Sequence, residues 1–366
     1  MSIAQPKSGA ARPVIAALLS GLLWSVAAPV HAQIQTAPEP VAAKPAAAKP
    51  AAAKPAAAKP APAAKSAAPA AAKPSAPAAT AAAAATAPAK PTAMLWEVRG
   101  PAGDMALAGK RLWLFGTMHV GKPEFYPLPA AVEKALASSV ALAVEADITN
   151  QAAIQASAPM MLLTPPDTLE SKLPSATIER LKKQLERLGV PYDAVKPMKP
   201  FILAGLLAVS EYSRQGFDQQ QGVDGHLINK ALARKLPIVE LEGVQKQMKL
   251  MSGMADADQQ AFLENSLVSL ESGKAGLQMD ALVKAWRSGD AAALEKAALE
   301  ATQGQARTAE LEELLLHSRN APMQDMAESM LASGKEHFVA VGALHLVGKR
   351  GIVESLRAKG YVVTQH

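Results

Sequence analysis

The sequence predicts an α/β fold in which two related units form a mainly parallel sheet, with a large helical insert between them. Residues 111–119, RLWLFGTMH, are an apolar run that ends in the pattern G-x-x-H. Residues 337–345, HFVAVGALH, repeat this arrangement more than two hundred positions later. Between the two, residues 148–330 carry apolar side chains mainly at helical spacing. Each unit is expected to read strand, G-x-x-H turn, helix and strand.

The first unit begins with a predicted hairpin. Residues 95–100 and 111–115 are strand-like runs joined by a segment containing the turn sequence PAGD. In residues 126–139, prolines precede an apolar-periodic run, as at the start of a helix. The strand-length apolar run VALAVEAD follows at residues 140–147.

The second unit repeats this order near the end of the chain. Residues 351–360, GIVESLRAKG, are expected to form its helix, and residues 361–365 its second strand. Successive strand–helix–strand units imply parallel pairing through right-handed crossovers.

The insert is expected to be mostly helical. Residues 175–190 start with Ser, space apolar residues four apart and stop near a Gly. Residues 222–236 read as a helix that leads into a short strand, PIVELE, at residues 237–242. Three further amphipathic runs carry Met and Leu stripes, which we interpret as core packing.

The N-terminal third is not expected to be part of the folded domain. Lys7 and Arg12 precede an apolar stretch, and the small residues of Val30-His31-Ala32 follow it, which is the layout of a signal peptide (residues 1–32) cleaved after about Ala32. An uncleaved anchor is the alternative, but the stretch is short against the ~20 apolar residues that cross a bilayer. A periplasmic or secreted protein is therefore expected.

Residues 33–93 are rich in Ala, Pro and Lys, with repeated AAAKP, and predict a disordered, extended tether. The first 93 residues contain nine of the 38 Lys and Arg and one of the 32 Asp and Glu, so residues 94–366 have 29 basic and 31 acidic residues. The basic character lies in the tether, which is a candidate for weak contact with envelope surfaces. The domain at residues 94–366 has no basic excess and the chain has few aromatic residues, so nucleic-acid binding is not expected.

Four strand tips could bring metal-binding side chains to one crevice. Ligands of open α/β sheets bind beyond the carboxyl ends of the strands. His119, Glu145 and His345 follow three of the predicted strands, and Glu242 ends the fourth, although Glu240 on the same strand could take its place. Two neutral imidazoles with one or two carboxylates suit zinc, manganese, cobalt or iron. The sequence therefore predicts a divalent metal ion held by His119, Glu145 and His345.

Other motifs contribute little. The chain has no Cys, which excludes thiol catalysis, disulfides and Cys-type zinc sites. It has neither H-E-x-x-H nor G-x-S-x-G. Asp224 and His226 are interpreted as helix-surface or core-edge residues, and His317 and His337 as solvent-facing ones.

The quoted blocks resemble the TraB/GumN family, which is related to the Tiki-type metalloproteases and distantly similar to ChaN and erythromycin-esterase proteins. The resemblance rests on LFGTMHVGKPEFYPLP, VEAD, GVDGHLINKALARKLPIVELEG, LLHSRNAPMQDMAESML and FVAVGALHLVGKRGIVESLRAKGY, and extends from about residue 95 to 363. It implies an α/β fold with a helical insert and, where activity is assigned, metal-dependent hydrolysis. It also adds Arg319 and Asn320 to the site, although Ser318 stands where the family often has an acidic or aromatic residue.

The favoured function is an exported metal-dependent hydrolase that cleaves peptide bonds in a peptide or other small substrate. Glu242 would act as general base, and Arg319, oriented by Asn320, would stabilise developing negative charge. Two alternatives use the same crevice: a metal-independent, esterase-like hydrolase, and a non-catalytic binding or signalling protein of the GumN type. The sequence does not determine the oligomeric state.

Overall fold

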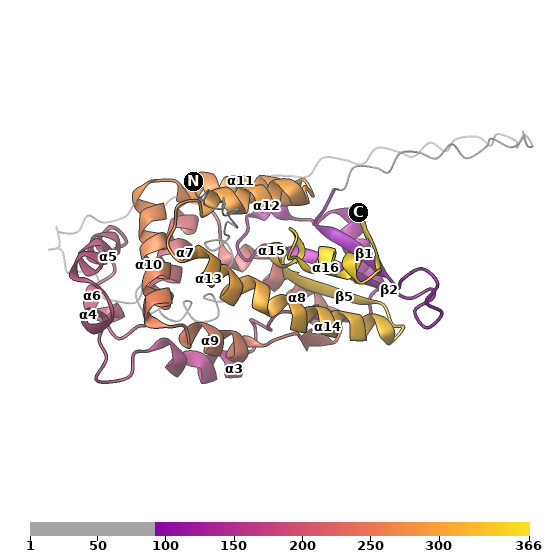
Figure 1. Cartoon of the computed structure of the whole chain (residues 1–366), viewed down its shortest axis with the longest axis horizontal. Coiled ribbons are helices and arrows are strands. Elements are labelled where there is room, and N and C mark those ends of the chain that lie inside the picture. Colours follow the sequence, from indigo (N-terminus) through magenta and orange to yellow (C-terminus); the bar gives the residue numbers. More distant parts are fainter. Residues whose placement is uncertain (1–91) are drawn as a thin grey trace, which may run out of the picture. The chain divides into compact units, whose positions relative to one another are not determined.

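The computed structural model describes residues 92–366 (Figure 1). The predicted signal peptide and nearly all of the tether lie outside these residues. Thr92 and Ala93, which were expected to lie in the tether, contact the domain: their N–H groups both donate to the carbonyl of His366, and Ala93 is buried. Within residues 92–366, no helix is long and apolar enough to cross a membrane.

One six-stranded sheet runs through the domain, with the order β4-β3-β5-β2-β1-β6. Every strand except β1 points in the same direction, so the predicted mainly parallel α/β sheet is confirmed. The strands are β1 (Leu95–Arg99), β2 (Arg111–Thr117), β3 (Ala141–Val144), β4 (Ile238–Glu240), β5 (His337–Gly342) and β6 (Val362–Gln365).

The two units interleave, which corrects the expectation that the strands of each unit pair with one another. The β1–β2 hairpin is antiparallel as predicted, but β5 lies between β2 and β3 and is parallel to both. Strand β6 pairs with β1. The connection after β2 runs toward one edge of the sheet, to β3, and the connection after β5 runs toward the other edge, to β6. The carboxyl ends of β2 and β5 therefore form a topological switch point, the place where open α/β sheets bind ligands.

The two motif glycines are offset by one position. Gly116 pairs with Val341, and Thr117 pairs with Gly342. A Cβ on Gly116 would lie 2.9 Å from the Cα and Cβ of Ala343. This glycine therefore lets the turn after β5 pack directly on β2.

The insert predicted at residues 148–330 is mostly helical, as expected, and contains β4, which is three residues shorter than predicted. The segments before and within it are η1 (Pro123–Phe125), α2 (Ala130–Ser138), α3 (Gln151–Ser157), η2 (Ala158–Met161), α4 (Leu169–Lys172), α5 (Ser175–Arg187), α6 (Tyr192–Val195), α7 (Pro200–Arg214), η3 (Gln219–Gln221), α8 (Val223–Ala233), α9 (Val244–Ser252), α10 (Asp256–Glu271), α11 (Ala275–Arg287), α12 (Ala291–Ala301), α13 (Thr308–Glu312) and the π-helical turn η4 (Glu313–His317). The chain ends through α14 (Ser318–Ala332), α15 (Ala343–Leu346) and α16 (Ile352–Ala358).

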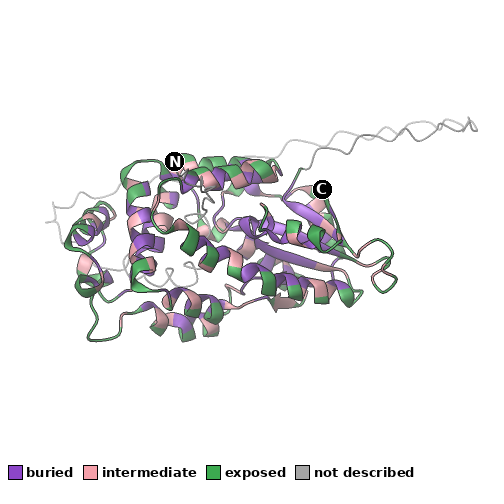
Figure 2. Ribbon diagram, viewed as in Figure 1, coloured by how far each residue is buried: buried purple, intermediate pink, exposed green. Residues whose placement is uncertain are grey.

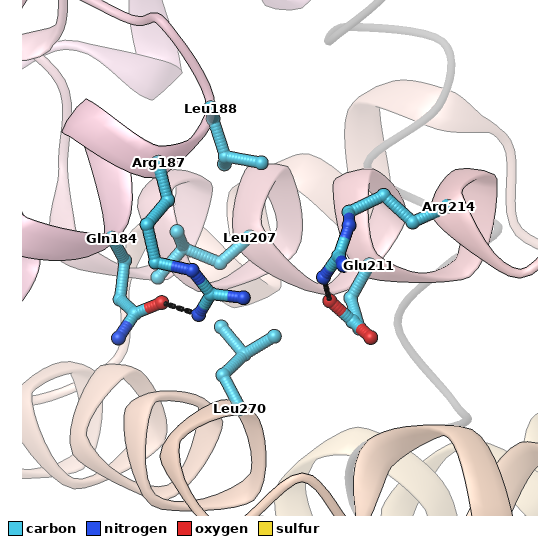
Figure 3. A pocket seen from close by; sticks show the side chains of 7 residues that line it. All are labelled: Gln184, Arg187, Leu188, Leu207, Glu211, Arg214 and Leu270. Atoms are coloured by element: carbon cyan, nitrogen blue, oxygen red, sulfur yellow. Dashed lines mark hydrogen bonds and ion pairs between the residues drawn. The ribbon is translucent and has the colours of Figure 1, made fainter.

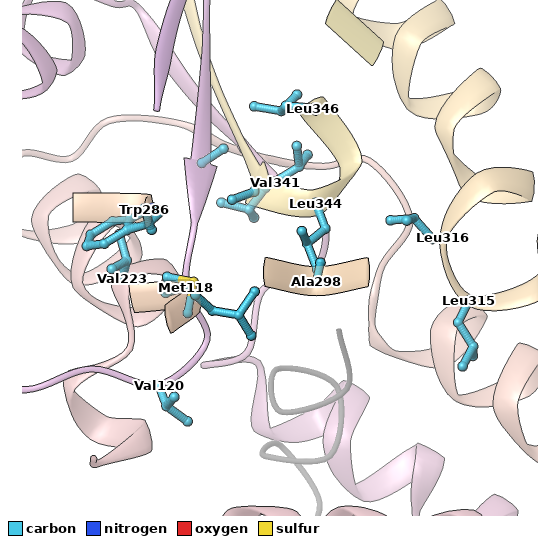
Figure 4. Packing of buried hydrophobic residues seen from close by; sticks show 14 of the residues in the cluster. Met118, Val120, Val223, Trp286, Ala298, Leu315, Leu316, Val341, Leu344 and Leu346 are labelled. Atoms are coloured by element: carbon cyan, nitrogen blue, oxygen red, sulfur yellow. The ribbon is translucent and has the colours of Figure 1, made fainter. Parts of the chain in front are cut away.

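The strands are almost wholly buried, whereas the helices alternate buried and exposed positions (Figure 2). Trp96, Phe115 and Phe338 are among the largest fully buried side chains of the core. Apolar residues at the strand ends, including Met118 and Leu344, belong to the same buried cluster (Figure 4). The carboxyl edge of the sheet is thus a dry, close-packed support for polar groups placed on it.

Candidate functional site

The four strand-tip residues lie in the order of their strands along one edge of the sheet. Glu242 follows β4, Glu145 follows β3, His345 lies in the turn after β5, and His119 follows β2. Because β4, β3, β5 and β2 are adjacent and parallel, their carboxyl ends meet at the same edge.

Glu145 is the centre of this arrangement and is buried. Its Oε1 accepts the Gly342 N–H at 2.7 Å, and its Oε2 accepts Nη2 of Arg319 at 2.5 Å and Nε2 of Gln247 at 3.0 Å. Burial alone would raise the pKa of this carboxyl, but Arg319 and the nearby imidazoles hold its pKa well below the usual range. Glu145 is therefore ionised at ordinary pH.

Gly342 leaves room for two of these groups. A Cβ at this position would lie 3.2 Å from both Glu145 Oε1 and His119 Nε2. Both side chains thus approach the same point of the backbone. Unlike Gly116, this glycine opens space for the polar side chains of the crevice.

Arg319 bridges the two carboxylates. Its Nη2 donates to Glu145 and, at 2.6 Å, to Glu242 Oε2, and its Nε donates to Glu242 at 3.0 Å. Its Nη1 donates at 2.8 Å to the carbonyl of Leu315 in the π-helical turn η4. Single π turns in helices often occur at functional sites, and here the turn supplies a fixed acceptor for the guanidinium.

The structure distinguishes the two candidate glutamates on the fourth strand. The side chain of Glu242 is 3% exposed and bonds to Arg319 and Gln247. Glu240 is exposed and accepts the N–H of Asp147 outside this network. Glu242 is therefore the residue that faces the crevice, but Arg319 and Gln247 occupy its carboxylate.

His345 is held by an uncharged partner. Its Nδ1 lies 2.7 Å from Oδ1 of Asn320, whose Nδ2 donates to the Arg350 carbonyl. Because this second bond fixes the amide, Nδ1 of His345 is the donor and Nε2 keeps its lone pair. Nε2 lies 3.7 Å from Glu145 Oε1. Burial lowers the pKa of His345 to about 3, so the ring is neutral at ordinary pH.

His119 is held by a charged partner. Its Nδ1 lies 2.8 Å from Oδ2 of Asp224, and Oδ1 of Asp224 accepts the hydroxyl of Thr117 at 2.6 Å. Burial opposes protonation of His119, but the Asp224 carboxylate outweighs burial and raises its pKa. The two motif histidines thus differ in charge behaviour because one faces a carboxylate and the other an amide.

Two expected roles change in the structure. Asp224, interpreted from the sequence as a helix-surface or core-edge residue, orients His119. Its place in the GVDGH block was the only sign in the sequence that it belongs to the site. The contact could not be foreseen because the two residues are 105 positions apart. Asn320 orients His345 and, within residues 92–366, makes no hydrogen bond to the Arg319 guanidinium that it was expected to orient. Gln247, which no motif marked, joins both carboxylates. His317 is half-buried and is not solvent-facing as expected.

The donor chemistry of the crevice fits a divalent metal ion. Within residues 92–366, His345 keeps the lone pair on Nε2, a His119 imidazole that donates Nδ1–H to Asp224 would do the same, and Glu145 Oε1 accepts one hydrogen bond. Ligand histidines in metal sites are held through their other nitrogen in this way. Two ligand atoms that each lie ~2.1 Å from a tetrahedral metal ion are ~3.4 Å from one another. The observed distance between His345 Nε2 and Glu145 Oε1, 3.7 Å, is close to this value. Nevertheless, no three His, Asp or Glu side chains in the described part of the chain are grouped as a formed metal site.

A separate cavity of about 170 Å³ lies between α5, α7 and α10 (Figure 3). Arg187 and Arg214 point into it from two helices, and each is already bonded to a neighbour, Gln184 or Glu211. None of the strand-tip residues lines this cavity.

Comparison with known proteins is consistent with this architecture. The model of the TraB/PrgY/gumN family matches residues 94–365. The chain is similar to the uncharacterized protein YbaP of Escherichia coli (strain K12), with 26% identity over 258 residues, which cover 70% of this chain and 92% of YbaP. YbaP of Shigella flexneri is similar to the same extent. No solved structure matches the chain.

Proposed function

The chain belongs to the TraB/PrgY/gumN family, and from this premise we propose that it is an exported metal-dependent hydrolase that cleaves peptide bonds at the carboxyl edge of its sheet. The observation that carries the proposal is the arrangement of His119 and His345 around Glu145. The two imidazoles come from adjacent parallel strands, and each is held through Nδ1 by its own partner.

In this proposal, His119, His345 and Glu145 hold the ion, which is of the zinc, manganese or cobalt class. When bound, such an ion supplies a Lewis acid and lowers the pKa of coordinated water to ~7. Metal ligands must be deprotonated. Neutral His345 and anionic Glu145 meet this requirement. His119 must give up a proton that Asp224 favours, so loading depends on pH.

The other residues hold the site in shape. Arg319 keeps Glu145 and Glu242 together, and Gln247 donates to both. We therefore assign Glu242 to positioning Arg319 in place of the general-base role expected from the sequence, since its carboxylate is already bonded. The remaining hydrogen on Nη1 of Arg319 is the group that could face negative charge in a substrate.

Export, a periplasmic or secreted location and tether contacts with the envelope belong to the proposal. They rest on the composition of residues 1–91, which lie outside the described residues. A peptide or other small molecule in the crevice is the proposed partner.

A metal-independent, esterase-like reaction is the second candidate, and the His119–Asp224 pair favours it. An imidazole whose Nδ1–H is held by a carboxylate is the arrangement of a general base. In that case His119 Nε2 would take the proton from water without an ion.

The test is metal content and peptide cleavage by the mature protein. We expect about one equivalent of divalent metal by elemental analysis after metal loading, and cleavage of a fluorogenic peptide library that a chelator abolishes. His119→Ala should lose both, and His337→Ala, at a strand start remote from the crevice, should lose neither. Cleavage that survives the chelator would favour the second candidate, and a metal-soaked protein without bound metal would contradict the first.

A further inference from the structure

A cavity of about 190 Å³ opens beside the β2 end of the crevice edge. Its lining is mixed: the apolar part comes from Met94, Phe115, Phe125, Trp286 and two prolines of the 123–129 segment, and the polar part from Thr92, Glu124 and Arg287. Its volume exceeds the ~150 Å³ of an apolar cavity that holds benzene. One ring-sized side chain would fill it.

The cavity and the crevice share one segment of chain. Leu95 pairs with Phe115, so the start of β1 and the end of β2 lie at the same edge of the sheet as His119. The loop that begins at His119 also supplies Phe125. Trp286 is fixed to this edge because its Nε1 donates at 2.7 Å to the Gly116 carbonyl.

The separation suits an extended peptide. Phe115 is four residues before His119, so their Cα atoms are at most ~14 Å apart. An extended peptide advances ~3.3 Å per residue. A side chain in the cavity would therefore belong to a residue at most about four positions from the cleaved bond.

The walls favour an aromatic ring. The ring centroids of Phe125 and Trp286 are 5.3 Å apart, and those of Phe115 and Trp286 6.5 Å, within the range of favourable ring pairs. At the rim, Arg287 lies over the Phe125 ring and donates to the Glu124 carbonyl. A small open cavity lined by aromatic rings and by the polar residues Thr92, Glu124 and Arg287 fits one side chain on a peptide backbone better than a long acyl chain.

We infer that this cavity is a specificity pocket, which takes one aromatic or branched apolar side chain of a peptide substrate within about four residues of the cleaved bond. The inference rests on the proposed peptide hydrolysis and adds a substrate class to it. Thr92 is exposed and lines the mouth, so a larger side chain there would close the pocket without disturbing the core.

Binding is measured first, because it requires no turnover. Ligand-detected NMR with the mature protein would compare N-acetyl-phenylalanine methylamide with N-acetyl-glycine methylamide. We expect the phenylalanine probe to bind at least about tenfold more tightly, as burial of a phenyl ring predicts. Thr92→Trp should remove this preference. Met105→Trp, at a hairpin position that is 87% exposed, is the matched control and should keep it.

Cleavage is measured second, with a peptide library that varies the position of one Phe. A Phe preference at one fixed distance from the cleaved bond, lost in Thr92→Trp while glycine-containing peptides are still cut, supports the pocket. Probe preference in the wild type and its loss in Thr92→Trp, without cleavage of any peptide, would support the pocket and contradict the proposed reaction. Equal binding of both probes, or a preference that survives Thr92→Trp, would overturn the pocket. A preference that emerges only after residues 33–91 are removed would also overturn the pocket, because it would indicate that the chain's own N-terminal segment occupies the cavity.

Discussion

His345 and Asn320 form a buried pair in which Nδ1 of the imidazole lies 2.7 Å from the amide Oδ1. The equivalent nitrogen of His119 lies 2.8 Å from a carboxylate oxygen of Asp224. A repeated motif thus has one neutral member and one member biased toward protonation. In the proposed metal site an ion would bind only where both rings are neutral, so this asymmetry would make His119 the residue that limits binding at low pH.

Exchanging the amide for a carboxylate should remove the asymmetry. In Asn320→Asp, the new anion would favour the protonated ring, so we expect the pKa of His345 to rise from about 3 toward the ordinary range. Histidine NMR titration of the metal-free protein measures this. Asn150→Asp, at the start of α3, should leave the His345 resonance where it is. An unchanged His345 pKa in Asn320→Asp would contradict the assigned contact.

The stability of the metal-free protein should fall in acid because of His345. Its folded pKa of about 3 lies below the unfolded value of ~6.5, so between these limits the unfolded state binds more protons. Stability therefore decreases as the pH falls from about 6.5 toward 3. Urea unfolding at pH 7 and pH 4.5 measures the difference, which should be smaller in His345→Gln. An equal difference in that variant would assign the acid sensitivity to other groups.

Removing Arg319 should be costly, because Glu145 and Glu242 would keep buried negative charges without a counter-ion. We expect Arg319→Met to lower the free energy of unfolding by ~3–5 kcal/mol. Arg214→Met breaks an exposed pair with Glu211 and should cost less than ~1 kcal/mol. Adding Glu242→Gln to Arg319→Met should restore part of the loss. If the double variant is no more stable than Arg319→Met, the two carboxylates do not repel each other as the structure implies.

The three proposed ligands should behave as one unit in metal binding. Loss of one of three ligands removes most of the affinity, so a second substitution should add little. Titration calorimetry of His119→Ala, His345→Ala and the double variant tests this. Additive losses would indicate that the two histidines contribute to separate sites.

Removing the N-terminal segment should leave the domain intact up to Thr92. A chain that starts at Thr92 should melt within about two degrees of the mature protein. A chain that starts at Leu95 loses the two bonds to the His366 carbonyl and the buried Met94, and should melt lower. Calorimetry of both proteins and the mature chain gives the comparison. A large drop in the first protein would show that residues 33–91 stabilise the domain.

Much of the fold could be predicted from periodicity and motif order, because Gly116 and Gly342 each end an apolar strand before a histidine. The pairing of the strands could not, because local sequence does not encode that β5 enters between β2 and β3. The same limit applied to the site. The positions of the predicted strand ends were enough to identify His119, Glu145 and His345. Asp224 and Gln247 could not be identified in this way, because each lies about a hundred residues from its partner in the sequence. Partners of this kind follow from tertiary packing alone.

The position of β5 also governs when the crevice can exist. Residues 337–345 are near the end of the chain, yet they form the middle of the sheet and carry His345, and their Gly342 N–H holds Glu145. A nascent chain lacks this central strand until residue 342 has emerged from the ribosome. The site would thus form only after the helices of the 148–330 insert and β5 itself have been made.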